Sequence, residues 1–258
     1  MAYKFFLGGA DAEMRRIAEI LSANGKPFAD AGLGWGAHAS AYAEEIAAGQ
    51  DGFTPVLVEL DNEFHAATEW SPAKHPVDLP QGTVVVDHHG PRSGEPASLL
   101  QVLALIGITP TRWDEIVAAN DSGFIPAMLT VGATDAEIAQ VRAADRSAQG
   151  ITPEQESEAE RAIASAEVTG RLTVVHLAHS KCATITDRLF GRYDQLIVLS
   201  DDGEANLYGD GALCANLKEK FGGWNGGSGL GQEGGNAFWG GNPSHAEVEA
   251  FVKEYLAV

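Results

Sequence analysis

The stretch Val84-Val85-Val86-Asp87-His88-His89 decides the fold of this sequence. Its β-branched run, bounded by turn residues, predicts a buried strand, and this strand ends on an acid and two imidazoles. In open α/β sheets, ligands bind beyond the carboxyl ends of the strands. Three adjacent polar groups at such an end also need partners. We therefore expect a sheet whose carboxyl edge carries a ligand site.

Strand-like and helix-like segments alternate through the first half of the chain. Apolar runs predict strands over residues 3–7, 28–33, 56–60 and 83–86. Apolar residues at helical spacing predict helices over residues 12–22, 39–48, 96–106 and 111–120. This alternation predicts an α/β fold in which helices cover both faces of a parallel sheet.

The second half has a different composition. Thr134-x-x-Glu137 and Thr152-x-x-Gln155 fit the capping box, and the second opens a polar-faced helix over 152–166 that we expect to connect two domains. Beyond it the pattern predicts strands over 172–177 and 195–199, a helix over 183–190, and a hairpin leading into 204–208. Ser244-x-x-Glu247 predicts the cap of a final helix. We expect a larger first domain, residues 1–168, and a smaller α/β domain, residues 169–258.

Composition excludes several classes of protein. Of the 258 residues, 45% are hydrophobic, which is enough to fill a core, and the two cysteines, Cys182 and Cys214, cannot form a disulfide scaffold. No apolar run approaches the roughly 20 residues that cross a bilayer. The apolar start is followed at once by charged residues, unlike a signal peptide. The sequence therefore predicts a cytoplasmic protein without a membrane partner.

The net charge of -19 opposes binding to long nucleic acid, because such binding depends on basic patches. A small phosphorylated substrate remains compatible with this charge, since metal ions can bring the positive charge that the chain lacks.

Further acids occupy positions like that of Asp87. Carboxylates and imidazoles that converge on one sheet edge suit Mn²⁺, or another divalent ion such as Mg²⁺ or Co²⁺. A carboxylate shared by two such ions would let the pair activate water and neutralise a phosphate. The alternative is that these acids cap helices and that each histidine is simply packed. The acids concerned are Asp11, Glu13, Asp61 and Asp121.

Asp87-His88-His89, followed by Pro96-Ala97-Ser98, resembles the signature of the DHH phosphoesterase superfamily, which includes nanoRNases, cyclic-dinucleotide phosphodiesterases and one class of pyrophosphatases. The resemblance spans nearly the whole chain. Phe221 to Gly227 resembles the glycine-rich loop of the DHH-associated C-terminal domain. The resemblance implies a parallel-sheet DHH domain joined to that smaller domain, with a cleft between them.

The resemblance also implies roles for single residues. Asp61 resembles the metal-bridging carboxylate, and His88 resembles the imidazole ligand. His89 resembles the neighbour that faces the substrate phosphate, and Asp87 would orient this cluster. Asp121 resembles the ligand that the family places before a small residue and a glycine.

The first motif departs from the family pattern. Where the family has His, Asp and Asp, this chain has Leu7, Asp11 and Glu13, so one ion would lack its imidazole ligand. The C-terminal loop departs as well, because the histidine that follows the family's glycines is missing. Here the loop, with its expected substrate-binding residues, consists of Gly222, Gly223, Trp224, Asn225, Gly226 and Gly227.

Three groups outside the acidic set have two interpretations each. The loop glycines either bring backbone N–H groups to a phosphate or form an ordered turn that needs positive φ. Trp224 and Trp239 either stack on a base or anchor a core, and for Trp239 we favour the core. Arg92 either contacts the substrate phosphate or is solvated.

These features predict a metal-dependent phosphodiesterase that cleaves short oligonucleotides or small nucleotides, through attack of a metal-bound hydroxide on phosphorus. Leu7 and the missing C-terminal histidine favour one alternative, a catalytically degenerate module that binds a nucleotide or a protein. An inorganic pyrophosphatase is a further alternative. The sequence leaves the oligomeric state open, a homodimer being one candidate.

Overall fold

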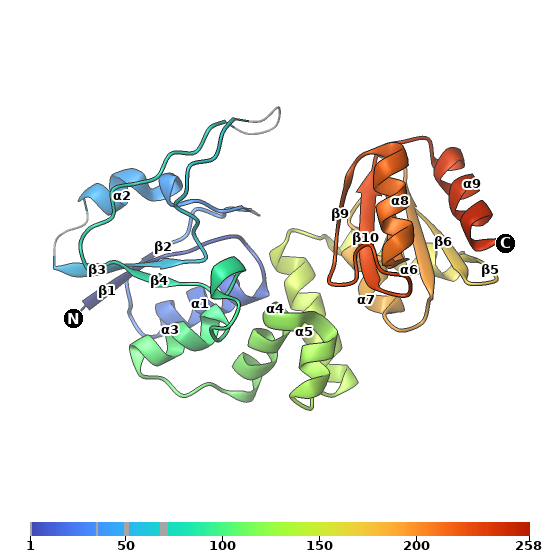
Figure 1. Cartoon of the computed structure of the whole chain (residues 1–258). Helices are drawn as coiled ribbons and strands as arrows, with labels where there is room; N and C mark the ends of the chain where they lie inside the picture. The colour runs from blue at the N-terminus through green and yellow to red at the C-terminus, as the bar shows by residue number, and fades with distance from the viewer. Residues whose placement is uncertain (1, 35, 49–51, 68–71) are drawn as a thin grey trace. The chain divides into compact units, whose positions relative to one another are not determined.

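The computed structural model describes residues 2–34, 36–48, 52–67 and 72–258 (Figure 1). The chain divides into two compact units, residues 1–150 and 151–258, and each is described here by itself. Both units combine helices with a sheet, which confirms the expected two-domain α/β class. No helix within the described ranges combines the length and the apolar character needed to cross a membrane.

The first unit is built on a four-stranded parallel sheet with the order β2-β1-β3-β4. The strands are short and mostly apolar, as in a sheet covered on both faces. They are β1 (Ala2–Phe6), β2 (Phe28–Ala29), β3 (Phe53–Val58) and β4 (Val84–Val86). The order reverses direction between β1 and β3, so the carboxyl ends of these two strands flank a topological switch point.

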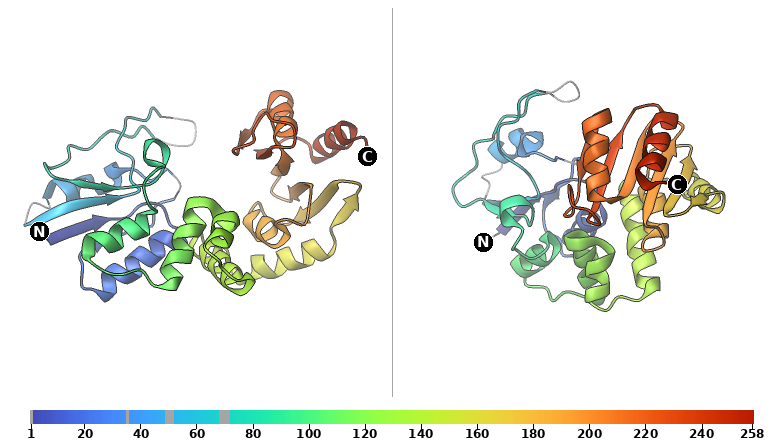
Figure 2. Two further views of the ribbon diagram at one scale, coloured as in Figure 1. Left: turned by 60° about the horizontal axis from the view of Figure 1, so that its bottom comes forward. Right: turned by 45° about the vertical axis from the view of Figure 1, so that its right-hand side comes forward.

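Helices cover both faces of this sheet, as the sequence predicted (Figures 1 and 2). On one face, Tyr42 and Ile46 pack with Phe6 and Leu57 of the strands. The 3-10 helix η1 (Ala39–Tyr42) and α2 (Ala43–Ala48) provide this cover. The other face is covered by α1 (Ala12–Ala23) and α3 (Ser98–Ile106), with the short 3-10 helix η2 (Gly90–Arg92) preceding α3.

Two more helices complete the first unit. Helix α4 (Arg112–Thr130) runs well beyond the predicted end at residue 120, and its backbone leaves helical geometry at Gly123 and Phe124. Helix α5 (Asp135–Ala148) begins with the predicted capping box of Thr134 and Glu137. Both helices pack on α1, and they also pack on each other.

The second unit contains a mixed six-stranded sheet with the order β5-β6-β7-β8-β10-β9, in which only β6 and β7 pair in parallel. Its helices are α6 (Pro153–Ala164), α7 (Ala183–Leu189), α8 (Gly211–Phe221) and α9 (His245–Leu256). Its strands are β5 (Glu167–Thr169), β6 (Leu172–Leu177), β7 (Gln195–Ser200), β8 (Ala205–Asp210), β9 (Trp224–Gly226) and β10 (Asn236–Gly241).

Several sequence expectations change in this unit. Helix α6 falls within this unit, where Ala159 packs against β6 and α7. The glycine-rich segment is not one loop, because Trp224–Gly226 and Asn236–Gly241 pair as antiparallel strands. Ser244 does precede α9, but its side chain makes no capping hydrogen bond within the described residues. Trp239 is fully buried in the core, as expected.

The paired strands explain the glycines at two positions. A Cβ on Gly227 would lie 2.7 Å from the Cα of Ala237, and the φ of Gly227 is 109°. A Cβ on Gly226 would lie 2.8 Å from the ring of Phe238. The close pairing of β9 with β10 therefore depends on the missing side chains.

We expect Gly227→Ala to lower the free energy of unfolding by about 2 kcal/mol, because it adds a steric clash to an unfavourable φ. Gly231→Ala is the matched control, since Gly231 also has a positive φ, 79°, but no atom within 4 Å of its Cβ position. Urea unfolding of both variants measures the difference. Equal losses would show that the clash relaxes without cost.

Candidate metal centre

The carboxyl edge of the parallel sheet carries a cavity of about 540 Å³. The register of β3 and β4 sets its centre, because Val58 pairs with Val86 and the next residues, Glu59 and Asp87, follow side by side. The segment after β1 lines the same cavity with Asp11. The cavity thus lies where strand-end residues collect at the switch point.

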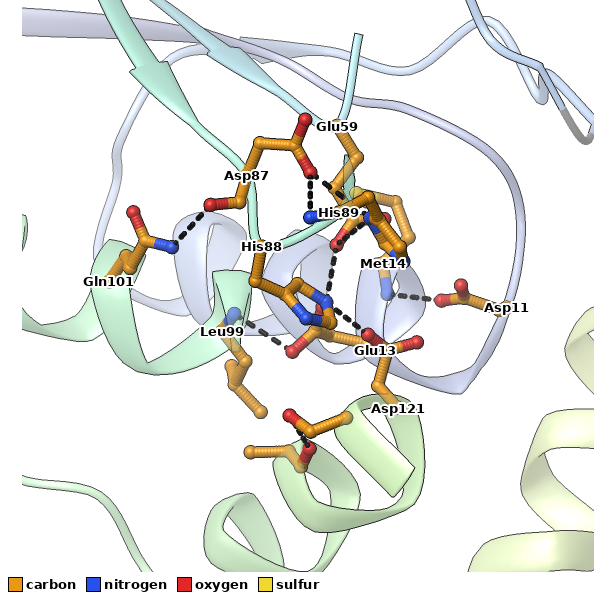
Figure 3. A network of polar contacts seen from close by, with 12 residues as sticks. Asp11, Glu13, Met14, Glu59, Asp87, His88, His89, Leu99, Gln101 and Asp121 are labelled. Carbon is orange, nitrogen blue, oxygen red and sulfur yellow. Dashed lines mark hydrogen bonds and ion pairs between the residues drawn. The ribbon is translucent and has the colours of Figure 1, made fainter. Parts of the chain in front are cut away.

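His88 lies at the centre of a group of carboxylates, of which Glu13 is buried and Glu59 and Asp121 are half-buried (Figure 3). Its Nε2 atom is 3.2 Å from Oε1 of Glu59 and 3.8 Å from Oε2 of Glu13, and it closely contacts Oδ2 of Asp121. Glu59 and His88 follow the ends of β3 and β4, and Glu13 and Asp121 lie in α1 and α4. The tertiary structure therefore gathers three acids and one imidazole around one point.

Apart from the ion pairs that His88 makes with Glu13, Glu59 and Asp121, the facing atoms of this group have no partner within the described part of the chain. They are Oε2 of Glu13, Oε1 of Glu59, Nε2 of His88 and Oδ2 of Asp121, and all are inaccessible to solvent. Buried polar atoms without other partners are rare in folded proteins. Each either lowers the stability of the fold or indicates a ligand that binds there. The donor set of one nitrogen and several oxygens is the one that Mn²⁺ and similar divalent ions prefer. The residues present therefore fit a divalent metal ion.

Other atoms of these side chains are held in place by the fold. Oε1 of Glu13 accepts the backbone N–H of Leu99 at the start of α3, at 3.0 Å. Glu59 has a φ of 50°, a left-handed conformation that non-glycine residues rarely adopt and that is found mostly at functional sites. A Cβ on Gly8 would lie 2.7 Å from the carbonyl oxygen of Glu59, so a glycine is required beside it. The strained turn directs Glu59 toward His88.

The pKa shifts of the group also indicate an excess of negative charge that a cation would offset. The carboxylates of Asp121 and Glu59 raise the pKa of His88 to about 10. Burial, then the charges of Asp121 and Glu59, raise the pKa of Glu13 well above its ordinary value. Burial raises the pKa of Asp11 to about 7, although Asp11 also caps α1 through Met14 N. Protons thus offset the negative charge of the cluster in the metal-free protein.

Asp61 takes a different position from the one its resemblance implies. It lines the cavity, but its Oδ1 accepts the N–H of Glu63 and its Oδ2 contacts Nε2 of His65. His38, which lies beside them, bonds Ser40 and the carbonyl oxygen of Glu63. His38, Asp61 and His65 form a second group that could hold a metal, but its polar atoms are bonded to protein groups. The facing atoms of the His88 group, by contrast, have no partner outside that group among the described residues.

Glu59 is the residue that sequence reasoning missed. The expected strand reached residue 60, so the first acid beyond it was Asp61, whereas β3 ends at Val58. Asp121 was grouped with acids at segment ends, but it lies inside α4. Its place beside His88 comes from the packing of α4. Glu59 could be found only from the end of β3 at Val58 and the pairing of Val58 with Val86, and the sequence shows neither.

Of the remaining residues that the sequence singled out, some line the cavity and others lie away from it. His89 lines the cavity, and its Nδ1 is 3.0 Å from Oδ1 of Asp87. Arg92 is exposed in η2 and is not among the residues that line this cavity. Leu7 is fully buried, and its carbonyl accepts the hydroxyl of Tyr42. The candidates from Gly222 to Gly227 belong to the second unit.

No family model and no curated protein matches this chain. Among solved structures it is similar to the pGpG-specific phosphodiesterase PggH from Vibrio cholerae, with 12% identity and a TM-score of 0.46 over 99% of each chain. It is also similar to an uncharacterized protein from Helicobacter pylori G27, with 10% identity and a TM-score of 0.28 over 98% of each chain. Both TM-scores are below 0.5, so neither likeness identifies an activity for this chain.

We expect His88→Ala to weaken Mn²⁺ binding at least tenfold, because it removes the imidazole around which the buried carboxylate oxygens gather. His65→Ala is the control, since it removes an imidazole of the second group. Calorimetric titration with Mn²⁺ measures both. A larger loss in His65→Ala would move the metal to the His38–Asp61–His65 group.

Metal binding should release protons at neutral pH. His88 carries a proton in the metal-free protein because its pKa is raised to about 10, and a metal ligand must be neutral. Between pH 6 and 8 the Mn²⁺ dissociation constant should therefore fall about tenfold per pH unit for each proton released. Calorimetry in buffers of different ionisation enthalpy counts these protons. A dissociation constant independent of pH would contradict the arrangement.

Proposed function

We propose that this chain is a divalent-metal-dependent phosphodiesterase of the DHH superfamily that hydrolyses short oligonucleotides or small nucleotides. One observation carries the proposal: four buried ligand atoms, paired only with one another, converge beside a cavity at the carboxyl edge of a parallel sheet. The resemblance of Asp87-His88-His89 to the family signature supports the reaction class. The family usually hydrolyses phosphate esters.

The ion would be held by Glu13, Glu59, His88 and Asp121, and Mn²⁺ is the proposed metal. When bound, it supplies positive charge to a phosphate and lowers the pKa of water. The chain's own contribution is to fix these side chains before the substrate arrives. Leu99 N–H holds Glu13, and the strained backbone holds Glu59.

His89 and Asp87 are proposed to handle the proton of the leaving group. Oδ1 of Asp87 accepts both the backbone N–H and the Nδ1–H of His89, which orients the ring and assigns the proton to Nδ1. Gln101 donates to the carbonyl oxygen of Asp87 and steadies this turn. Nε2 of His89 then remains to exchange a proton with substrate. The rings of His88 and His89 lie 4.2 Å apart, which places His89 next to the cluster.

The cavity supports a small substrate. Its volume of about 540 Å³ lies in the ordinary range for small-molecule sites. The net charge of -19 opposes a long polyanion, whereas a dinucleotide needs only local positive charge. The second unit is proposed as the substrate-binding domain, on the likeness of Phe221 to Gly227 to the DHH-associated loop.

Leu7 favours a second candidate function, a degenerate module that binds a nucleotide or a protein without hydrolysis. It is buried where the family has a histidine, so the first of two ions would lack a ligand. Asp61, which would bridge two ions, is bonded to Glu63 and His65. We therefore propose a single tightly bound ion.

We expect the purified protein to bind one Mn²⁺ per chain and to hydrolyse a 5′-phosphorylated dinucleotide slowly. Asp121→Asn should reduce this rate at least a hundredfold, since it removes a ligand. Asp114→Asn is a matched control, because Asp114 is another buried acid of α4 but pairs with Arg16. Elemental analysis and product chromatography are the measurements.

The outcomes separate the candidate functions. Mn²⁺ binding without hydrolysis of the dinucleotide or of pyrophosphate would establish the degenerate module. Hydrolysis of pyrophosphate alone would establish the pyrophosphatase that the sequence also allowed. Equal rates in the two aspartate variants would remove Asp121 from the centre.

A further inference from the structure

One basic side chain lines the acidic cavity. Among the described residues that line it, six are aspartate or glutamate and Arg142 is the only lysine or arginine. Arg142 belongs to α5, and only 8% of its surface is exposed. A charge removed from water to this extent lowers the stability of the fold unless it is paired.

The fold holds the guanidinium of Arg142 in one orientation. Its Nη1 donates to Oδ1 of Asn120 at 2.8 Å and to Oδ2 of Asp145 at 2.7 Å. Asn120 directly precedes Asp121, so the arginine is tied to the segment that supplies a proposed metal ligand. A fixed guanidinium loses little rotational freedom when it binds an anion.

The charge of Asp145 is shared among several donors. Its Oδ1 accepts the N–H of Ala12 at the start of α1, at 3.0 Å, and its Oδ2 also accepts Nε2 of Gln149 at 3.0 Å. Part of this negative charge is therefore stabilised by the positive end of α1. Asp145 therefore anchors Arg142 at the wall of the cavity.

The break in α4 completes the setting. Phe124 has a φ of 57°, which is rare for a bulky residue, and the guanidinium carbon of Arg142 lies 4.6 Å from the centre of its ring. A continuous helix would not have this backbone geometry at Phe124. The strained turn thus provides a cation–π surface beneath the arginine, and such strain is typical of ligand sites.

We propose that Arg142 binds a phosphate group of the substrate and so determines the preference of this cavity for phosphorylated ligands. The proposal rests on the proposed function for the identity of the ligand. It goes further in assigning to α5 a substrate-binding role that no motif in the sequence marked. Arginine suits this role because its planar fork matches phosphate oxygens.

The proposal can be tested without turnover by a calorimetric titration of the Mn²⁺-loaded protein with inorganic phosphate. Arg142→Gln should raise the phosphate dissociation constant at least tenfold, with Arg142→Lys between it and the wild type. The KM for a 5′-phosphorylated dinucleotide should rise more than kcat falls. Arg16→Gln is the matched control, since it breaks another arginine–aspartate pair of the first unit, with Asp114.

A purely structural arginine would give a different pattern. Arg142→Gln would then lower the melting temperature as Arg16→Gln does, and phosphate affinity and KM would stay at wild-type values in both variants. That result, or a wild type that binds no phosphate, would overturn the proposal. Phosphate affinity that depends on Arg142 in a protein that hydrolyses no dinucleotide would uphold it and refute the phosphodiesterase activity.

Discussion

The first unit is organised around the meeting of Glu13, Glu59 and Asp121 at a single imidazole, with their facing atoms out of contact with water. Burial and the neighbouring carboxylates raise the pKa of Glu13, whereas at Glu59 the hydrogen bond with His88 outweighs the effect of burial and lowers the pKa. Protons offset the negative charge of this group in the metal-free protein, as the raised pKa of His88 shows. A divalent cation would offset it better, since every facing atom is a potential ligand.

The surrounding fold maintains this unfavourable arrangement. The short parallel sheet brings Glu59 and Asp87 side by side, and the buried faces of α1 and α3 keep the strand ends in register. Two residues of the first unit, Glu59 and Phe124, have a positive φ. Strain of this kind persists only where the neighbouring packing determines it, and it commonly marks ligand sites. The hydrophobic core therefore stabilises a polar centre that would not form by itself.

Two groups that could hold a metal lie at the same sheet edge, and hydrogen bonding separates them. His38 and Asp61 are bonded to Ser40 and Glu63, outside their own group, whereas the facing atoms of the His88 group contact only one another. Arg142 lines the same cavity as Glu59 and Asp121 and adds positive charge to its wall. Metal ligands and a fixed arginine around one cavity are suited to a phosphate, because its charge would be met from two sides.

The sequence by itself determined the local elements and the class of fold. Alternating apolar periods located most helices and strands, and the boxes at Thr134 and Thr152 located two helix starts, because these signals depend on near neighbours. It also marked His88 and Asp121 as candidates. Only the tertiary structure selected Glu59 in place of Asp61 beside His88, and only it brought Arg142 to the cavity. Those choices depend on where a strand ends, on its register and on the packing of α4 and α5. Contacts between distant segments decide these features, and no local pattern encodes them.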